Sequence, residues 1–214
     1  MEWVVRMRKW FAATTAVLAV LVLASCSEAP TSAGTKTETA PRKEAPAGPV
    51  TAKTAFFEMY KPARAWAPDF MLLSMDSSEV PGITSDGGKF GMWRAVFVSP
   101  SRNEARTFTY AVVSSGTDIH KGVDISPAQT WSGPTPASRP FQTMDFATDS
   151  DAAYQVAIAK AGAWVKEHPD KKAAFTLANA SRFPTPVWYI LWGTKTSGYS
   201  VLVSATTGTE VKAK

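Results

Sequence analysis

Residues 186–211 read P-V-W-Y-I-L-W-G-T-K-T-S-G-Y-S-V-L-V-S-A-T-T-G-T-E-V, the most strand-like passage of the chain. An aromatic and β-branched run, Val187 to Trp192, is followed by a polar turn and a second apolar run, Tyr199 to Val203. Runs of this kind joined by short Gly-, Ser- and Thr-containing turns are typical of antiparallel strands. The passage therefore predicts a β-meander, closed by a Thr-Thr-Gly turn and a short final strand.

A looser copy of this passage lies about a hundred residues earlier. Strands are expected at 70–73, 92–98 and 106–113, and a further strand at 174–180 precedes the meander. Each set of strands follows a segment whose apolar residues recur at helical spacing. The two apolar stripes comprise Ala52, Ala55, Phe56, Met59, Tyr60 and Ala63, then Tyr154, Ala157, Ile158, Ala161 and Val165. Asp149 to Asp151 offer N-cap residues for the second helix, and Pro62 is expected to kink or interrupt the first.

The two halves align as an internal repeat. Trp66 and Trp164 are 98 residues apart, Trp93 and Trp188 are 95 apart, and the sequences G-T-D-I at 116–119 and G-T-E-V at 208–211 are 92 apart. The matched positions keep their order in both halves, and their separation shortens gradually, as it would if loops had changed length after a duplication. The alternative is a coincidental match between two unrelated α+β segments. We expect an α+β protein with two tandem small domains, residues 51–126 and 149–214. Each would pack one helix on an antiparallel sheet, and a linker, 127–148, would lie against a domain surface.

The second unit, with its ending at 199–211, resembles the PepSY domain. That family's final hairpin typically reads aromatic-x-V-x-V-D-A-x-T-G-x-V, and Ser204 stands here where the pattern has Asp. The first unit lacks the V-D-A step. The resemblance implies a PepSY/cystatin-like fold. It also implies inhibitory or regulatory binding, because PepSY domains occur in protease propeptides and envelope proteins.

The first fifty residues predict export and lipid attachment. A basic front precedes an apolar run from Phe11 to Leu23, which is shorter than the ~20 residues of a spanning helix. Leu23-Ala24-Ser25-Cys26 resembles the bacterial lipobox, so residues 1–25 are expected to be a lipoprotein signal peptide. Cys26 would then carry acyl chains such as palmitate and anchor the protein to a bilayer. The alternative is a chance cysteine ending an ordinary signal peptide. Residues 26–50, rich in Pro, Ala, Thr and Lys, are expected to be a disordered tether.

Charge and composition narrow the classes of partner. Removal of the signal peptide leaves 20 basic and 17 acidic residues, a net charge of +3, without a run of Lys and Arg interleaved with aromatics. Nucleic acid is therefore not an expected partner. With Cys26 as the one cysteine, an exported fold of this chain must be stable without an intramolecular disulfide.

The sequence offers few residues for catalysis. His120 and His168 are its two histidines, and no serine lies in a G-x-S-x-G elbow. Asp118, His120 and Asp124 make a loose trio without the spacing of a zinc or EF-hand site. His168 is expected at a helix C-terminus, where a positive charge on the imidazole would interact favourably with the helix dipole. We therefore expect no enzyme, no metal and no cofactor.

Strand alternation defines a candidate partner-binding face. Trp188, Ile190 and Trp192 point to one side of their strand, and a helix is expected to cover that side. The residues on the opposite side are apolar enough to mark a contact surface, or to be buried between the two sheets or by the linker. The candidate contact residues are Arg94, Val96, Val98, Tyr189 and Leu191.

These patterns together predict an envelope lipoprotein that binds or regulates a periplasmic or surface protein. The PepSY resemblance alone implies the more specific role, inhibition of a protease. It would reside at the outer membrane or at the periplasmic face of the inner membrane. The alternatives are a structural envelope-assembly protein and, third, a hydrolase. The oligomeric state is not predicted.

Overall fold

The computed structural model describes residues 48–212, which form two helices, a 3-10 helix and one antiparallel sheet. The elements are α1 (Ala52–Trp66), β1 (Met71–Ser78), β2 (Met92–Ser99), β3 (Glu104–Ala111), β4 (Gly122–Ile125), β5 (Gln129–Thr130), η1 (Thr143–Asp145), α2 (Ser150–Glu167), β6 (Ala173–Ala178), β7 (Val187–Trp192) and β8 (Tyr199–Ser204). The signal peptide, Cys26 and nearly all of the expected tether lie outside the described residues. Neither helix of the described chain has an apolar stretch of membrane-spanning length.

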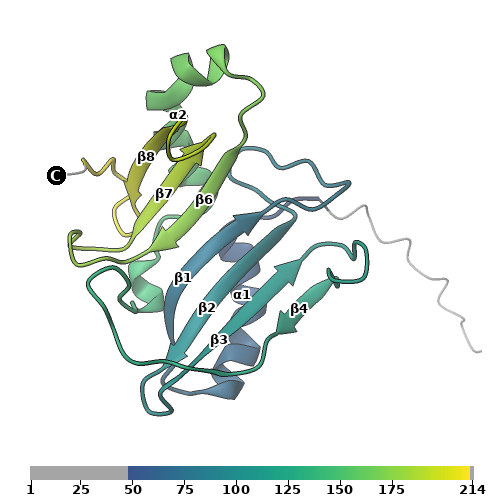
Figure 1. The fold of residues 1–214 in the computed structure, drawn as a ribbon, viewed down its shortest axis with the longest axis vertical. Coiled ribbons are helices and arrows are strands. Elements are labelled where there is room, and N and C mark those ends of the chain that lie inside the picture. The colour runs from purple at the N-terminus through teal and green to yellow at the C-terminus, as the bar shows by residue number, and fades with distance from the viewer. Residues whose placement is uncertain (1–47, 213–214) are drawn as a thin grey trace, which may run out of the picture. The chain divides into compact units, whose positions relative to one another are not determined.

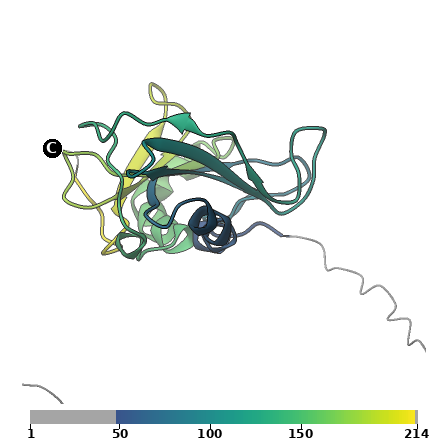
Figure 2. The same cartoon turned by 90° about the horizontal axis from the view of Figure 1, so that it is seen from below.

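The strands are ordered β4-β3-β2-β1-β6-β7-β8, and β5 pairs with β3. The strands of the first half and those of the second half join where β1 pairs with β6, with Met75 opposite Leu177. Figure 1 shows the sheet continuing across this junction, and Figure 2 shows both helices on one side of it. The α+β class and the antiparallel sheet are confirmed. A division into two separate domains is not shown, because the halves meet edge to edge within one sheet.

The first helix forms on the predicted stripe. The Thr51 side chain caps it by accepting from the Thr54 amide, and Ala52, Ala55, Phe56, Met59 and Ala63 are buried. The expectation that Pro62 interrupts the helix is wrong, since α1 continues to Trp66. Proline at this position removes the hydrogen bond to the carbonyl of Glu58, and Glu58 is exposed, so water can replace the lost donor.

The second helix begins and ends where the sequence predicts. Asp149 is its N-cap, and the small buried residues Ala153, Ala157 and Ala161 let it pack closely on the sheet. His168 is its C-cap; its Nδ1 lies 2.8 Å from the Trp164 carbonyl oxygen, and its ring stacks on the Trp164 indole at 4.1 Å. The His168 side chain therefore packs over the C-terminal turn of α2 and contacts one of its last carbonyl groups.

Equivalent hydrogen bonds occur in the two halves. The Trp93 indole nitrogen donates to the Val50 carbonyl at 2.9 Å, and the Trp188 indole nitrogen donates to the Thr148 carbonyl at 2.9 Å. Each acceptor immediately precedes a helix N-cap, so each tryptophan ties its strand to the start of its own helix. These matched contacts support the internal repeat that the tryptophan spacing indicated.

The start of α2 also caps the start of α1. The Ser150 hydroxyl accepts from the Ala52 amide at 2.9 Å, and the Asp149 carboxylate accepts from the Lys53 amide at 2.9 Å. Amides of a first turn have no partner within their own helix, so another group must satisfy them when they are partly buried. The second half therefore supplies partners that the helix of the first half lacks.

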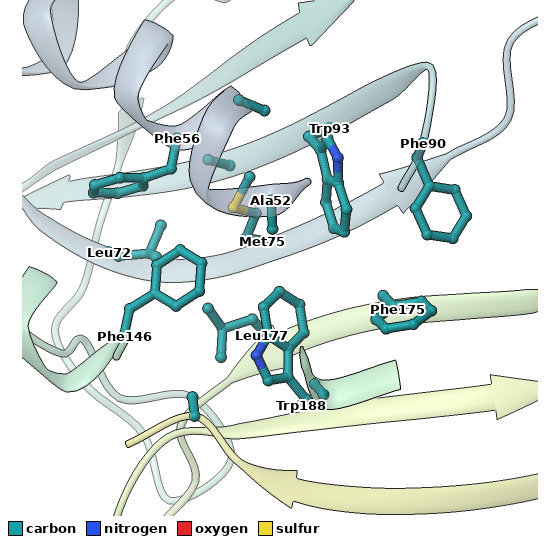
Figure 3. Packing of buried hydrophobic residues seen from close by; sticks show 14 of the residues in the cluster. Ala52, Phe56, Leu72, Met75, Phe90, Trp93, Phe146, Phe175, Leu177 and Trp188 are labelled. Atoms are coloured by element: carbon teal, nitrogen blue, oxygen red, sulfur yellow. The ribbon is translucent and has the colours of Figure 1, made fainter. Parts of the chain in front are cut away.

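One hydrophobic cluster runs beneath the whole sheet. Trp93 and Trp188 meet at the junction with ring centroids 6.1 Å apart, and Phe90 and Phe175 lie beside them (Figure 3). Trp66 packs over Phe108 of β3, and Trp164 packs near Tyr199 of β8. The helix-facing side of the strands is thus the core, as the alternation predicts.

The remaining segments differ in part from expectation. Strand β4 was not predicted, and the expected final strand is reduced to an isolated bridge between Val203 and Glu210. The linker packs against the sheet as predicted. Phe141 pairs with Leu72 and is buried, and Phe146 is buried within the core cluster.

Candidate functional site

The side of the sheet opposite the helices, here called the outer face, faces the viewer in Figure 1. Cross-strand pairing places one row of residues across seven strands, with one residue from each strand in the order β4-β3-β2-β1-β6-β7-β8. The row consists of Asp124, Thr109, Arg94, Asp76, Thr176, Tyr189 and Leu202. The row is polar over the first half and becomes apolar after Thr176. The Thr176 hydroxyl donates to the Asp76 carboxylate at 2.7 Å at the junction. The outer face is thus chemically different in the two halves.

A groove of about 480 Å³ lies on the apolar part of the outer face. Its floor is formed by β6, β7 and β8, and its sides by the β6–β7 loop, the linker and Lys195. The lining residues are Ala137, Thr176, Ala178, Ala180, Arg182, Phe183, Val187, Tyr189, Lys195 and Leu202. This volume is within the usual range of small-ligand and side-chain pockets.

The charges around the groove have one sign. Arg182 and Lys195 are exposed at its rim, and the lining contains no carboxylate. The Arg182 guanidinium lies 4.7 Å from the centre of the Phe183 ring, which orients it beside the apolar wall. The groove therefore matches a partner that combines apolar side chains with negative charge.

Backbone hydrogen bonds hold the wall formed by the loop and the linker. The Ser181 amide donates to the Pro136 carbonyl at 2.8 Å, and the Arg139 amide donates to the Asn179 carbonyl at 2.9 Å. At the other end of the loop, the hydroxyls of Thr185 and Ser204 lie 3.2 Å apart. Because these contacts join segments distant in sequence, the groove is preformed rather than dependent on a partner.

The predicted contact residues lie in different places on this face. Tyr189 lines the groove, and Leu191 is half-buried one row away, opposite Ala174 and Ser200. Arg94 is exposed and lies in the same row as Tyr189, three strands away, which is roughly 14 Å at the usual strand spacing. Val96 is half-buried near the junction.

Val98 does not belong to an accessible surface. It is 0% exposed although it points to the outer face. The linker runs from Trp131, whose amide donates to the Asn103 carbonyl beyond the end of β2, to Phe141, which pairs with Leu72 of β1, the neighbour of β2 at this end. The linker therefore buries this part of the outer face, which is one of the two alternatives that the sequence left open.

The loose trio Asp118, His120 and Asp124 borders one cavity of about 290 Å³, together with Arg94. Within residues 48–212, no three His, Cys, Asp or Glu side chains are grouped closely enough to hold a metal ion. The guanidinium of Arg94 also makes this cavity electrostatically poor for a cation.

Of the ten groove residues, Tyr189 alone was among the predicted contact residues; those missed include Phe183, Arg182, Lys195 and Leu202. Leu202 was within reach, since it alternates with Val201 and Val203 in a predicted strand. The other three lie in loops, where no periodicity shows which way a side chain points.

Comparison with known proteins adds little to this description. No protein-family model matches the sequence, and no curated protein matches it. Among solved structures, the chain is similar to a candidate lipoprotein from Clostridium difficile 630, with a TM-score of 0.43 and 10% sequence identity over 79% of this chain and 94% of that chain. A likeness of this size carries no argument about function. The PepSY resemblance and the lipid anchor therefore stay predictions from the sequence.

Proposed function

We propose that this protein is a lipid-anchored envelope protein that binds another protein without catalysing a reaction. Its contact surface is the groove on the outer face of the second half. The observation that carries the proposal is the preformed groove of about 480 Å³, with a floor of Tyr189 and Leu202 that neither helix covers. Apolar surface left open beside a preformed wall is typical of interaction sites.

The rim selects the chemistry of the partner. Arg182 and Lys195 are not balanced by a carboxylate in the lining, so an apolar segment that carries Asp or Glu fits best. A protease-inhibitory role is the most specific form of this function and rests on the PepSY resemblance alone. The membrane anchor rests on the lipobox that ends at Cys26.

Envelope pull-downs with matched variants test the proposal. Leu202→Asp places a charge in the groove, and the double variant Arg182→Glu/Lys195→Glu reverses the rim. Lys61→Glu, an exposed charge reversal on α1, is the control. We expect the first two variants to retain the circular dichroism spectrum and to lose at least about tenfold in affinity for the captured partner, while Lys61→Glu is unchanged.

The rim charges give a second readout. Partner binding to the wild type should weaken as salt rises, and the rim variant should lose most of that dependence. If both groove variants fold and still capture the partner as the wild type does, the contact surface lies elsewhere.

A further inference from the structure

A second cavity, of about 260 Å³, lies on the helix side of the sheet and is separate from the groove. The loop between β1 and β2, helix α2 and the start of β6 enclose it. Four aromatic residues line it: Phe90, Tyr154, Phe175 and Trp192. The Tyr154 ring lies 6.4 Å from Phe175 and 6.2 Å from Trp192, so the rings form one connected wall.

The charged residues at this cavity are unevenly paired. Lys172 lies 3.8 Å from Glu79, and Lys171 lies 2.7 Å from Asp170, so both ammonium groups have an acidic partner. Asp86 also lines the cavity and forms no ion pair with any residue in the range 48–212. The lining thus holds two acidic and two basic residues, and Asp86, which is exposed, is the one of these four without an ion pair.

The fold holds Asp86 in this position. Its amide donates to the Lys89 carbonyl at 3.1 Å, and the Lys89 amide donates back at 2.8 Å, across a two-residue Gly-Gly turn. Gly88 has a φ of 83° and packs so closely on the Ser150 carbonyl that a side chain would overlap it. The turn of the first half is thus fixed against the helix of the second half.

Two hydrogen-bond donors of the wall have no partner among the described residues. The Tyr154 hydroxyl and the Trp192 indole N–H make no hydrogen bond with residues 48–212, and neither polar atom is buried away from solvent. Burial, and then the nearby Asp86 carboxylate, raise the pKa of Tyr154, so its hydroxyl stays protonated at neutral pH. Both groups can donate to a hydroxyl of a bound molecule.

We propose that this cavity binds a small organic cation of the quaternary ammonium class. Aromatic faces attract such cations through the ring quadrupole, and the Asp86 carboxylate supplies the opposite charge. The two unpartnered donors suit a ligand that also carries a hydroxyl. This site is independent of the outer-face groove, so either proposal can fail alone.

Calorimetry on the full chain in detergent tests this site, with choline as the probe and 3,3-dimethylbutan-1-ol as its neutral isostere. We expect choline to bind at least about tenfold more tightly than the isostere, because the isostere has the same shape but lacks the positive charge. Asp86→Asn should reduce choline affinity by at least about tenfold. Asp124→Asn, an exposed carboxylate on β4, should leave it unchanged.

Tyr154→Leu provides a second variant, which removes one wall of the cavity and leaves Asp86 in place. It should also weaken choline binding while the partner pull-down stays at the wild-type level. The proposal is overturned if choline does not bind, if the isostere binds equally well, or if folded Asp86→Asn and Tyr154→Leu variants keep wild-type affinity.

Discussion

The Asp149 carboxylate joins the two helix starts, and its removal should cost more than the loss of an ordinary N-cap. Its Oδ1 accepts from the Ser150 amide at 2.7 Å and from the Lys53 amide at 2.9 Å. Loss of the cap on α2 costs about 1 kcal/mol. Asp149→Ala also leaves the partly buried Lys53 amide without a partner, which costs about 1–2 kcal/mol more.

The sum is about 2–3 kcal/mol of unfolding free energy, or a fall in Tm of about 4–12 °C for a chain of this size. Urea and thermal unfolding followed by circular dichroism measure it. Asp151→Ala is the control, since the Asp151 carboxylate accepts only from the neighbouring Ala152 amide. Asp149→Asn should recover most of the loss. If Asp149→Ala costs no more than Asp151→Ala, the cross-capping between the halves has no energetic weight.

Two further predictions concern stability. Gly88→Ala should destabilise the protein by about 1–3 kcal/mol in urea unfolding, because of its positive φ and the overlap with the Ser150 carbonyl, whereas Gly116→Ala meets no neighbouring atom and should cost only the strain of its φ. The amide of Ser101 and then the hydroxyl of Ser99 hold the pKa of Asp69 below its ordinary 3.8. A lowered folded-state pKa contributes stability that is present above pH 3.8 and is lost as the pH falls through the folded value. Asp69→Asn should therefore make the free energy of unfolding less dependent on pH below about pH 4. If the variant loses stability with falling pH as steeply as the wild type, this assignment is wrong.

Local pattern predicted the elements well where one side of each element is buried. The run from Val187 to Trp192 is a strand with the bounds that the sequence indicated, because it is a short continuous run of aromatic and aliphatic residues between Pro186 and Gly193. The N-cap of α2, Asp149, was one of the three candidates, 149–151, that precede the apolar stripe.

Features that depend on distant parts of the chain gave no such signal. Neither β1 nor β6 contains a sequence pattern that indicates the pairing of Met75 with Leu177. The sequence therefore predicted two tandem units but not the sheet that they share. Burial of Val98 depends on the path of the linker, which has no periodicity. The groove could be predicted only in part. Strand alternation identified Tyr189, whereas Arg182 lies in a loop, where no periodicity indicates its orientation.

The pairing of β1 with β6 has a consequence for the order in which the chain acquires its structure. Strands β1 to β4 are made first, and one side of β1 then presents open amides and carbonyls until β6, which begins 48 residues after the end of β4, has been synthesised. Such an exposed strand is a template for pairing with another chain. Closing so long a loop is also slow. Until β6 pairs with β1, this edge of the first half is therefore open to pairing with another chain.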